Sequence, residues 1–224
     1  TLEHIHQTAD FLSAIRRSIG NQLDTIVFFE VPDTTRILLE SAFWDIYYEH
    51  CSYFTLGSLA RLFRSLRFEV NSLYRGFGDQ YILIEARPVE KVSQKVHKLE
   101  DTPKETAENI EFFSKNCSEK LAHWKHLLQQ IAIDQKRAVV WGSGSKCVAF
   151  LTTLNVKDEI EYAIDINPFR HWKFLPGIGK RIVPPDFLRE YDPDITIVMN
   201  PIYSKEIQQA LNEMGIRTKV ISIE

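Results

Sequence analysis

The stretch RAVVWGSGSKCVAFLTTL, residues 137–154, decides the fold of the C-terminal part of this chain. It starts with a short apolar run, turns through two glycines and continues with a helical pattern. The same alternation goes on, with apolar runs at 159–165, 181–183, 194–199 and 218–223 and a helical pattern over 204–215. Strands that alternate with helices are typical of a parallel sheet covered by helices on both faces. We therefore predict a parallel Rossmann-like α/β domain over residues 137–224.

The glycine turn in that stretch is a candidate phosphate-binding site. Glycine lets backbone N–H groups approach a phosphate closely, and the start of the following helix adds a partial positive charge. Asp165, at the end of the next strand, stands where a dinucleotide-binding fold places its ribose-binding acid. The G-x-G-x-x-G pattern would require glycine at the position of Cys147, so a tight turn without a ligand stays an open alternative. The turn residues predicted to contact the nucleotide are Gly142, Ser143, Gly144, Ser145 and Lys146.

Two further segments follow strands of the same predicted sheet. NPFRHWKFLPGIGK, residues 167–180, mixes Arg170 and Lys173 with proline and glycine, and Asn200 ends a later strand. Ligands of open α/β sheets bind at the carboxyl edge of the strands. These three side chains are therefore predicted ligand contacts, and a solvated loop is the alternative for the first segment.

A long helix is predicted ahead of this domain. Residues 102–105, TPKE, place Thr102 as the N-cap, Pro103 at the first helical position and Glu105 as the partner in a capping box. Apolar residues then recur every three or four positions up to Ile131. A helix of about 30 residues would be about 45 Å long, so we expect residues 89–136 to connect two domains.

The N-terminal residues predict a smaller set of elements. A helix is expected over 7–19, a buried strand over 24–32, and a second helix over 58–68 with Ser58 as its cap. Two strands follow, with a glycine-containing turn between them. Helix, strand, helix and hairpin together suggest the second half of a larger sheet.

Composition narrows the class of protein. The 224 residues carry a net charge of −3, with 44% hydrophobic and 25% charged residues, as in an ordinary soluble domain. Scattered basic residues argue against nucleic-acid binding, and no apolar run approaches the ~20 residues of a membrane span. Three isolated cysteines indicate a reducing compartment and predict no metal site. From these features, and from the lack of a signal peptide at Thr1, we expect a cytoplasmic protein.

The stretch IYYEHCSYF, residues 46–54, crowds aromatic side chains around Glu49 and His50. A buried charge is costly unless it is paired or hydrogen-bonded. The stretch is therefore either a surface turn or a partly dry pocket that needs a proton carrier. The residues alone leave both possibilities open.

Longer segments resemble the S-adenosylmethionine-dependent sugar C-methyltransferases. The segment from 30 to 70 matches that family's E-x-P strand end and Y-x-E-H-x-x-Y-F signature, followed by a helix and a hairpin. The segments VVWGSGSKCVAFLTTL, AIDINPFRHWKFLPG and PDITIVMNPIYSKEI resemble its C-terminal α/β domain. The resemblance extends over essentially the whole chain, with the motifs in the family's order. It implies that residues 1–88 are the C-terminal half of a methyltransferase domain.

The resemblance also implies chemistry. These enzymes methylate a carbon beside the ketone of a nucleotide-linked 4-keto-deoxysugar, such as a thymidine diphosphate sugar. His50 would be the base that removes the C–H proton, because histidine titrates near neutrality. Glu49 would orient the imidazole or contact the sugar, and Tyr47 would donate a hydrogen bond to the enolate oxygen. The aromatic neighbours would exclude water.

This chain departs from the family's pattern in several places. Arg67 stands at a helix end where the family usually has glycine, and Cys147 replaces another customary glycine. The family's zinc-binding cysteines and the loop that holds S-adenosylmethionine would precede Thr1. We therefore expect this chain alone to be inactive and open to self-association along an exposed sheet edge. Two rival hypotheses are a nucleotide-sugar-binding or scaffold domain without turnover and a nicotinamide-dependent oxidoreductase.

Overall fold

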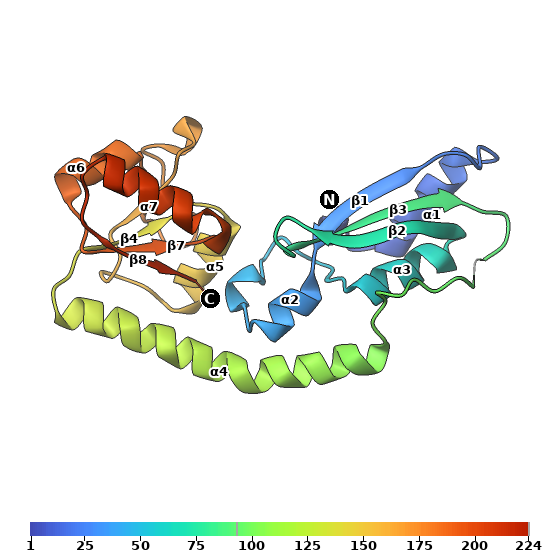
Figure 1. Ribbon diagram of the computed structural model, residues 1–224, viewed down its shortest axis with the longest axis horizontal. Coiled ribbons are helices and arrows are strands. Elements are labelled where there is room, and N and C mark those ends of the chain that lie inside the picture. Colours follow the sequence, from blue (N-terminus) through green and yellow to red (C-terminus); the bar gives the residue numbers. More distant parts are fainter. Residues whose placement is uncertain (93, 224) are drawn as a thin grey trace. The chain divides into compact units, whose positions relative to one another are not determined.

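The structure is a computed structural model that describes residues 1–92 and 94–223. Ser93, in the predicted connection, and Glu224 lie outside the described residues. The chain divides into two compact units (Figure 1). The first contains Thr1–Ser41 and Tyr48–Lys115, and the second contains Ala42–Tyr47 and the chain from Asn116 onward. In the described part of the chain, no helix combines the length and the apolarity that a membrane span needs.

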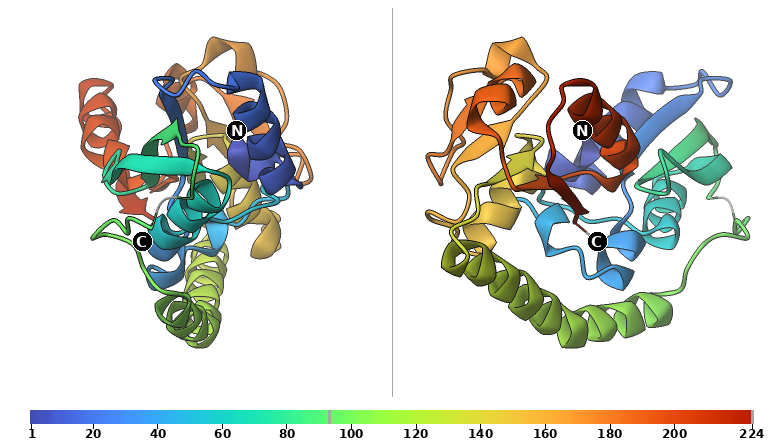
Figure 2. Two further views of the ribbon diagram at one scale, coloured as in Figure 1. Left: turned by 90° about the vertical axis from the view of Figure 1, so that its right-hand side faces the viewer. Right: turned by 60° about the vertical axis from the view of Figure 1, so that its left-hand side comes forward.

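The first unit is built on a three-stranded antiparallel sheet in the order β1-β3-β2. In this register Ile84 lies opposite both Phe29 and Leu73. Helices α1 and α3 pack on the face that carries Ile82 and Ile84, and Figure 2 shows both beside the sheet. The elements are α1 (Thr8–Ile19), β1 (Val27–Pro32), α2 (Thr34–Leu39), α3 (Leu56–Ser65), β2 (Phe68–Gly76) and β3 (Tyr81–Pro88).

Strand β1 differs from the buried strand that the sequence predicts. It lies at the edge of the sheet, and its burial alternates: Val31 is fully buried while Phe28 is 52% exposed. The reason is that, among the described residues of the first unit, the helices cover the face that carries Ile82 and Ile84, so side chains of β1 alternate between that core and solvent. A continuous apolar run therefore indicated a strand correctly but overstated its burial.

The N-cap of helix α3 is Thr55, and the prediction of Ser58 was wrong by one turn. The Thr55 hydroxyl accepts from the Ser58 N–H (3.1 Å), and the Ser58 hydroxyl accepts from the Thr55 N–H (2.8 Å). This reciprocal pair is a capping box in which Ser58 takes the third helical position. Asp101 adds to it by accepting from the Thr55 hydroxyl and from the Gly57 N–H, both at 2.8 Å.

Arg67, just beyond helix α3, has a φ of 62°, in the left-handed region that favours glycine. We expect Arg67→Gly to raise the free energy of unfolding by about 1 kcal/mol, because it removes the strain on Cβ. Arg67→Ala is the matched control, since it removes the same side chain but keeps Cβ. Urea unfolding of the three proteins measures the difference. Equal stability of the glycine and alanine variants would show that the left-handed backbone costs nothing here.

Helix α4 (Pro103–Ile133) has 31 residues, as predicted in length and position. Its capping box is formed: the Thr102 N–H donates to Glu105 (2.7 Å), and the Glu105 N–H donates to the Thr102 hydroxyl (3.2 Å). The apolar stripe is buried only in the second half of the helix, at Trp124, Leu128 and Ile131. The boundary between the two units falls inside this helix, between Lys115 and Asn116.

The second unit has a five-stranded parallel sheet in the order β6-β5-β4-β7-β8, which confirms the predicted α/β fold. The chain runs outward from β4 through β5 to β6 and then returns to the other side of β4. The carboxyl ends of β4 and β7 therefore flank a topological switch point. The elements are β4 (Ala138–Trp141), α5 (Ser145–Thr153), β5 (Tyr162–Ile164), β6 (Arg181–Val183), α6 (Leu188–Tyr191), β7 (Ile195–Val198), α7 (Ser204–Glu213) and β8 (Lys219–Ser222).

A short segment from the N-terminal half of the sequence belongs to this second unit. The 3-10 helix η2 (Phe43–Asp45) packs against α5. The Phe43 ring stacks on Phe150 at 6.0 Å, and Trp124 meets Phe150 edge-on at 4.9 Å. These aromatic contacts attach residues 42–47 to the Rossmann-like domain.

Candidate functional site

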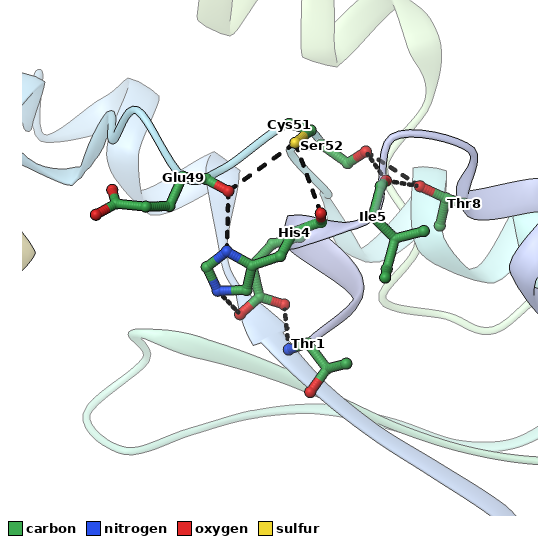
Figure 3. Close-up of polar contacts among 8 residues, drawn as sticks. Thr1, His4, Ile5, Thr8, Glu49, Cys51 and Ser52 are labelled. Carbon is green, nitrogen blue, oxygen red and sulfur yellow. Dashed lines mark hydrogen bonds and ion pairs between the residues drawn. The ribbon is translucent and has the colours of Figure 1, made fainter.

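The second half of the signature, residues 49–52, lies against the first residues of the chain. The Cys51 N–H donates to the Glu3 carbonyl (2.8 Å), and one ring nitrogen of His4, Nδ1, is 2.9 Å from the Glu49 carbonyl (Figure 3). The Glu49 side chain points away from His4 and is exposed. Glu49 therefore lies at the surface, which is one of the two possibilities that the residues alone left open.

His50 is half-buried beside His4, with their ring centroids 4.9 Å apart. Potential ligand atoms of Glu3, His4 and His50 lie within 4.8 Å of one another, so this group could hold a metal ion. The Glu3 carboxylate already accepts from the Thr1 ammonium at 2.7 Å. Burial alone would raise the pKa of Glu3, but its hydrogen bonds to the Thr1 ammonium and to its own backbone, together with nearby positive charge, lower the pKa.

Tyr47 belongs to the second unit, whereas Glu49 and His50 belong to the first. The Tyr47 hydroxyl donates to Asp45 Oδ1 at 2.7 Å. Lys146, from the glycine turn, places its ammonium 3.1 Å from the same carboxylate oxygen. Sequence reasoning missed Asp45, although an acid within the apolar run FWDIY was a usable signal.

The glycine turn itself follows strand β4 as predicted. Gly142 has a φ of 108°, and a Cβ there would lie 3.3 Å from Met199. Gly144 is the N-cap of α5, and Ser145 is the first residue of that helix. Cys147 is fully buried, and burial raises the pKa of its thiol. The turn is thus tightly packed with Cys147 in place of glycine.

Asp165 joins the turn to the segment that follows β5. Its Oδ2 accepts from the Ser143 N–H (3.1 Å), from the Ser143 hydroxyl and from Arg170 (3.1 Å). Its Oδ1 accepts from the Asn167 N–H (2.9 Å), and its carbonyl lies 2.7 Å from the His171 ring. Burial alone would raise the pKa of Asp165, but these hydrogen bonds and the Arg170 charge lower it. Asp165 therefore stays ionised and holds the two segments together.

Two further predicted contacts, Lys173 and Asn200, have other surroundings that the structure describes. The Lys173 side chain is exposed. The Asn200 side chain accepts from the Ile202 N–H (3.3 Å) at the start of a short 3-10 helix. Of the predicted contacts in the second unit, the structure therefore brings together Ser143, Asp165 and Arg170.

We expect Asp165→Asn to lower the free energy of unfolding by about 1–3 kcal/mol at pH 7, because the buried N–H and hydroxyl of Ser143 lose a charged acceptor and Arg170 loses its ion-pair partner. The native pKa is lowered, so the carboxylate stabilises the fold above its unfolded pKa of about 3.9 and loses this effect as the pH falls through the native value. The difference between wild type and variant should therefore shrink in acid. Denaturant unfolding at several pH values tests this.

Asp186→Asn is the matched control, because Asp186 pairs with Arg189 at 3.6 Å but is 85% exposed. It should change stability by no more than about 0.5 kcal/mol. Equal effects of the two substitutions would show that Asp165 does not stabilise the fold by holding the two segments together.

Comparison with known proteins agrees with the resemblance. A family model described as the C-methyltransferase C-terminal domain matches residues 81–221. The chain is 25% identical over 212 residues to the C-methyltransferase NovU of Streptomyces niveus, covering 91% of this chain and 49% of that protein. The chain thus spans about half the length of this curated relative.

A solved structure, the UDP-D-quinovosamine 4-dehydrogenase from Vibrio fischeri, is 18% identical over 39% of this chain and 76% of its own, with a TM-score of 0.32. That value is too low to support any argument. The family model carries the assignment, since it extends from the last strand of the first unit to the last strand of the second. The chain belongs to the C-methyltransferase family and carries its C-terminal domain.

Proposed function

We propose that this chain is the part of a sugar C-methyltransferase that binds a nucleotide-diphosphate sugar and prepares it for methylation. The observation that carries the proposal is the family match over 81–221, together with the Y-x-E-H signature at 47–50. The substrate class would be a 4-keto-deoxysugar, which has an acidic C–H bond beside its ketone. A soluble protein in the cytoplasm would suit a nucleotide-linked substrate.

The proposed proton transfer uses His50. Its neutral imidazole would take the proton from the carbon beside the ketone. The electrons of that C–H bond would form the enolate double bond, and the carbonyl π electrons would move to oxygen. A general base of this kind contributes about 10²–10⁴-fold to a rate. Glu49 would contact a hydroxyl group of the sugar, because its carboxylate is exposed and points away from the His4 ring.

The family implies S-adenosylmethionine as the methyl donor. The strand-end acid of this chain is largely engaged within the protein. Asp165 Oδ2 accepts from Ser143 and Arg170, and Oδ1 accepts from the Asn167 N–H, so little of its acceptor capacity is left for ribose hydroxyls. The same observation weighs against a nicotinamide cofactor and hence against an oxidoreductase. We assign no residue of this chain to either cofactor or to the zinc site that the family implies.

The nucleotide would lie at the carboxyl edge of the second sheet, over the 142–146 turn, the Arg170–Lys173 segment and Asn200. Titration with thymidine diphosphate, followed by amide NMR, should shift signals from these three segments. Lys173→Gln should weaken binding about tenfold or more, because a charged contact to phosphate is lost.

Lys205→Gln, which removes an exposed lysine from helix α7 of the same unit, is the matched control and should leave the affinity unchanged. Signal changes that avoid all three segments would refute this site.

A further inference from the structure

Tyr47, Asp45 and Lys146 form a connected polar group inside the second unit. The Tyr47 hydroxyl is 2.7 Å from Asp45 Oδ1, and the Lys146 ammonium is 3.1 Å from Oδ1 and 3.2 Å from Oδ2. Lys146 is 101 positions away from Asp45 in the sequence. The group therefore exists only when residues 42–47 are packed on the Rossmann-like domain.

The two charged members of this group are largely buried. The side chain of Asp45 is 6% exposed and that of Lys146 is 18% exposed. A buried carboxylate is stable only if it is paired and hydrogen-bonded, and Lys146 supplies the charge. Lys146 is the second residue of helix α5, where the helix dipole disfavours a cation. The ion pair thus stabilises both the Lys146 ammonium and the Asp45 carboxylate.

The direction of the hydrogen bond from Tyr47 follows from this pairing. An ionised carboxylate can only accept, so the single O–H of Tyr47 must be the donor. A tyrosine that donates to Asp45 cannot donate the same proton to an enolate oxygen. What it offers to a ligand is the lone pairs of its oxygen.

The position of Asp45 is set by the aromatic side chains just before it. Phe43 stacks on Phe150, and Trp44 lies edge-on to Phe43 at 4.9 Å with the Lys120 ammonium 5.5 Å from its ring centre. Asp45 ends the 3-10 helix that carries these rings. The carboxylate is therefore held in place before any ligand arrives.

We propose that Asp45 and Lys146 are positioning residues. They keep the Tyr47 O–H donating to the Asp45 carboxylate, so that the Tyr47 oxygen acts as a hydrogen-bond acceptor for a sugar hydroxyl. The identity of this ligand rests on the proposed function. The arrangement of the three side chains does not. Lys146, which the sequence suggested as a phosphate contact, would then act through Asp45 and Tyr47.

The test follows the phenol of Tyr47 directly, without ligand or turnover. The chain is labelled with tyrosine carrying ¹³C at the ζ carbon, and the Tyr47 signal is identified by its loss in Tyr47→Phe. Asp45→Asn and Lys146→Met should each move this signal at pH 7, because each changes the acceptor of the Tyr47 proton. Lys146→Arg should keep the signal near its wild-type position, since it restores the charge.

Lys136→Met is the matched control, because Lys136 pairs with Asp134 at 2.9 Å on the surface of the same unit. It should leave the Tyr47 signal in place. Far-ultraviolet circular dichroism of each variant confirms that it is folded, and Lys146→Met tests the group even if Asp45→Asn does not fold. A Tyr47 signal that stays unchanged in a folded variant of either residue would overturn the proposal, whether or not the chain takes part in methyl transfer.

Discussion

Replacing His50 by asparagine is expected to lower methyl-transfer turnover by about 10²–10⁴-fold in the natural full-length protein. The affinity for the nucleotide sugar should stay nearly the same, because only the transition state needs the proton transfer. His50 is suited to this role because it is half-buried, with its ring packed against His4 at 4.9 Å and Tyr53 at 6.1 Å. The measurement is the rate of methyl transfer at saturating substrate, with binding followed separately by calorimetry.

His126→Asn is the matched control, since His126 is an exposed histidine on helix α4. It should leave both the rate and the affinity at wild-type levels. A near-normal rate in the His50 variant would place the base elsewhere, and Glu49 would be the next candidate. Loss of sugar binding along with the rate would instead make His50 a binding residue.

The main features of the fold could be predicted because they depend on neighbours in the sequence. The turn after β4 and the capping box at Thr102 each follow from a few adjacent residues, whereas the left-handed backbone at Arg67 was indicated only by the glycine that the family usually has there. Strand β1 was misjudged because its burial depends on what covers the sheet, which lies far away in the sequence. Local sequence patterns therefore predicted the helices, strands and caps better than they predicted how deeply each element is buried.

The candidate site shows the same difference between features set by nearby residues and features set by distant ones. Asp165 was found from its place at a strand end, but its bonds to Ser143 and Arg170 required the folded loops. The link from Tyr47 through Asp45 to Lys146 could not be predicted, since the two charged residues are 101 positions apart. No periodicity or motif relates residues at that separation. The resemblance to a family identified the signature, and the structure then showed which of its side chains are already engaged.

Segment 42–47 depends on one buried ring of helix α5. Phe150 is fully buried and contacts Phe43, Trp44 and Trp124. The ring contacts the 3-10 helix that carries Asp45, so the proposed positioning group depends on it. A change in packing at Phe150 should therefore affect Tyr47 through the backbone of residues 43–45.

Phe150→Ala is expected to lower the free energy of unfolding by about 3–5 kcal/mol, because it removes a buried ring and leaves a cavity that its neighbours cannot fill. Phe169→Ala, at a phenylalanine of the same unit that is 81% exposed, is the control and should change stability by no more than about 0.5 kcal/mol. Urea unfolding followed by tryptophan fluorescence gives both values. In the folded fraction of Phe150→Ala the Tyr47 ζ-carbon signal should move as it does in Lys146→Met, since the segment carrying Asp45 loses its support. An unchanged Tyr47 signal, despite the loss of stability, would show that residues 42–47 are held by contacts other than this ring.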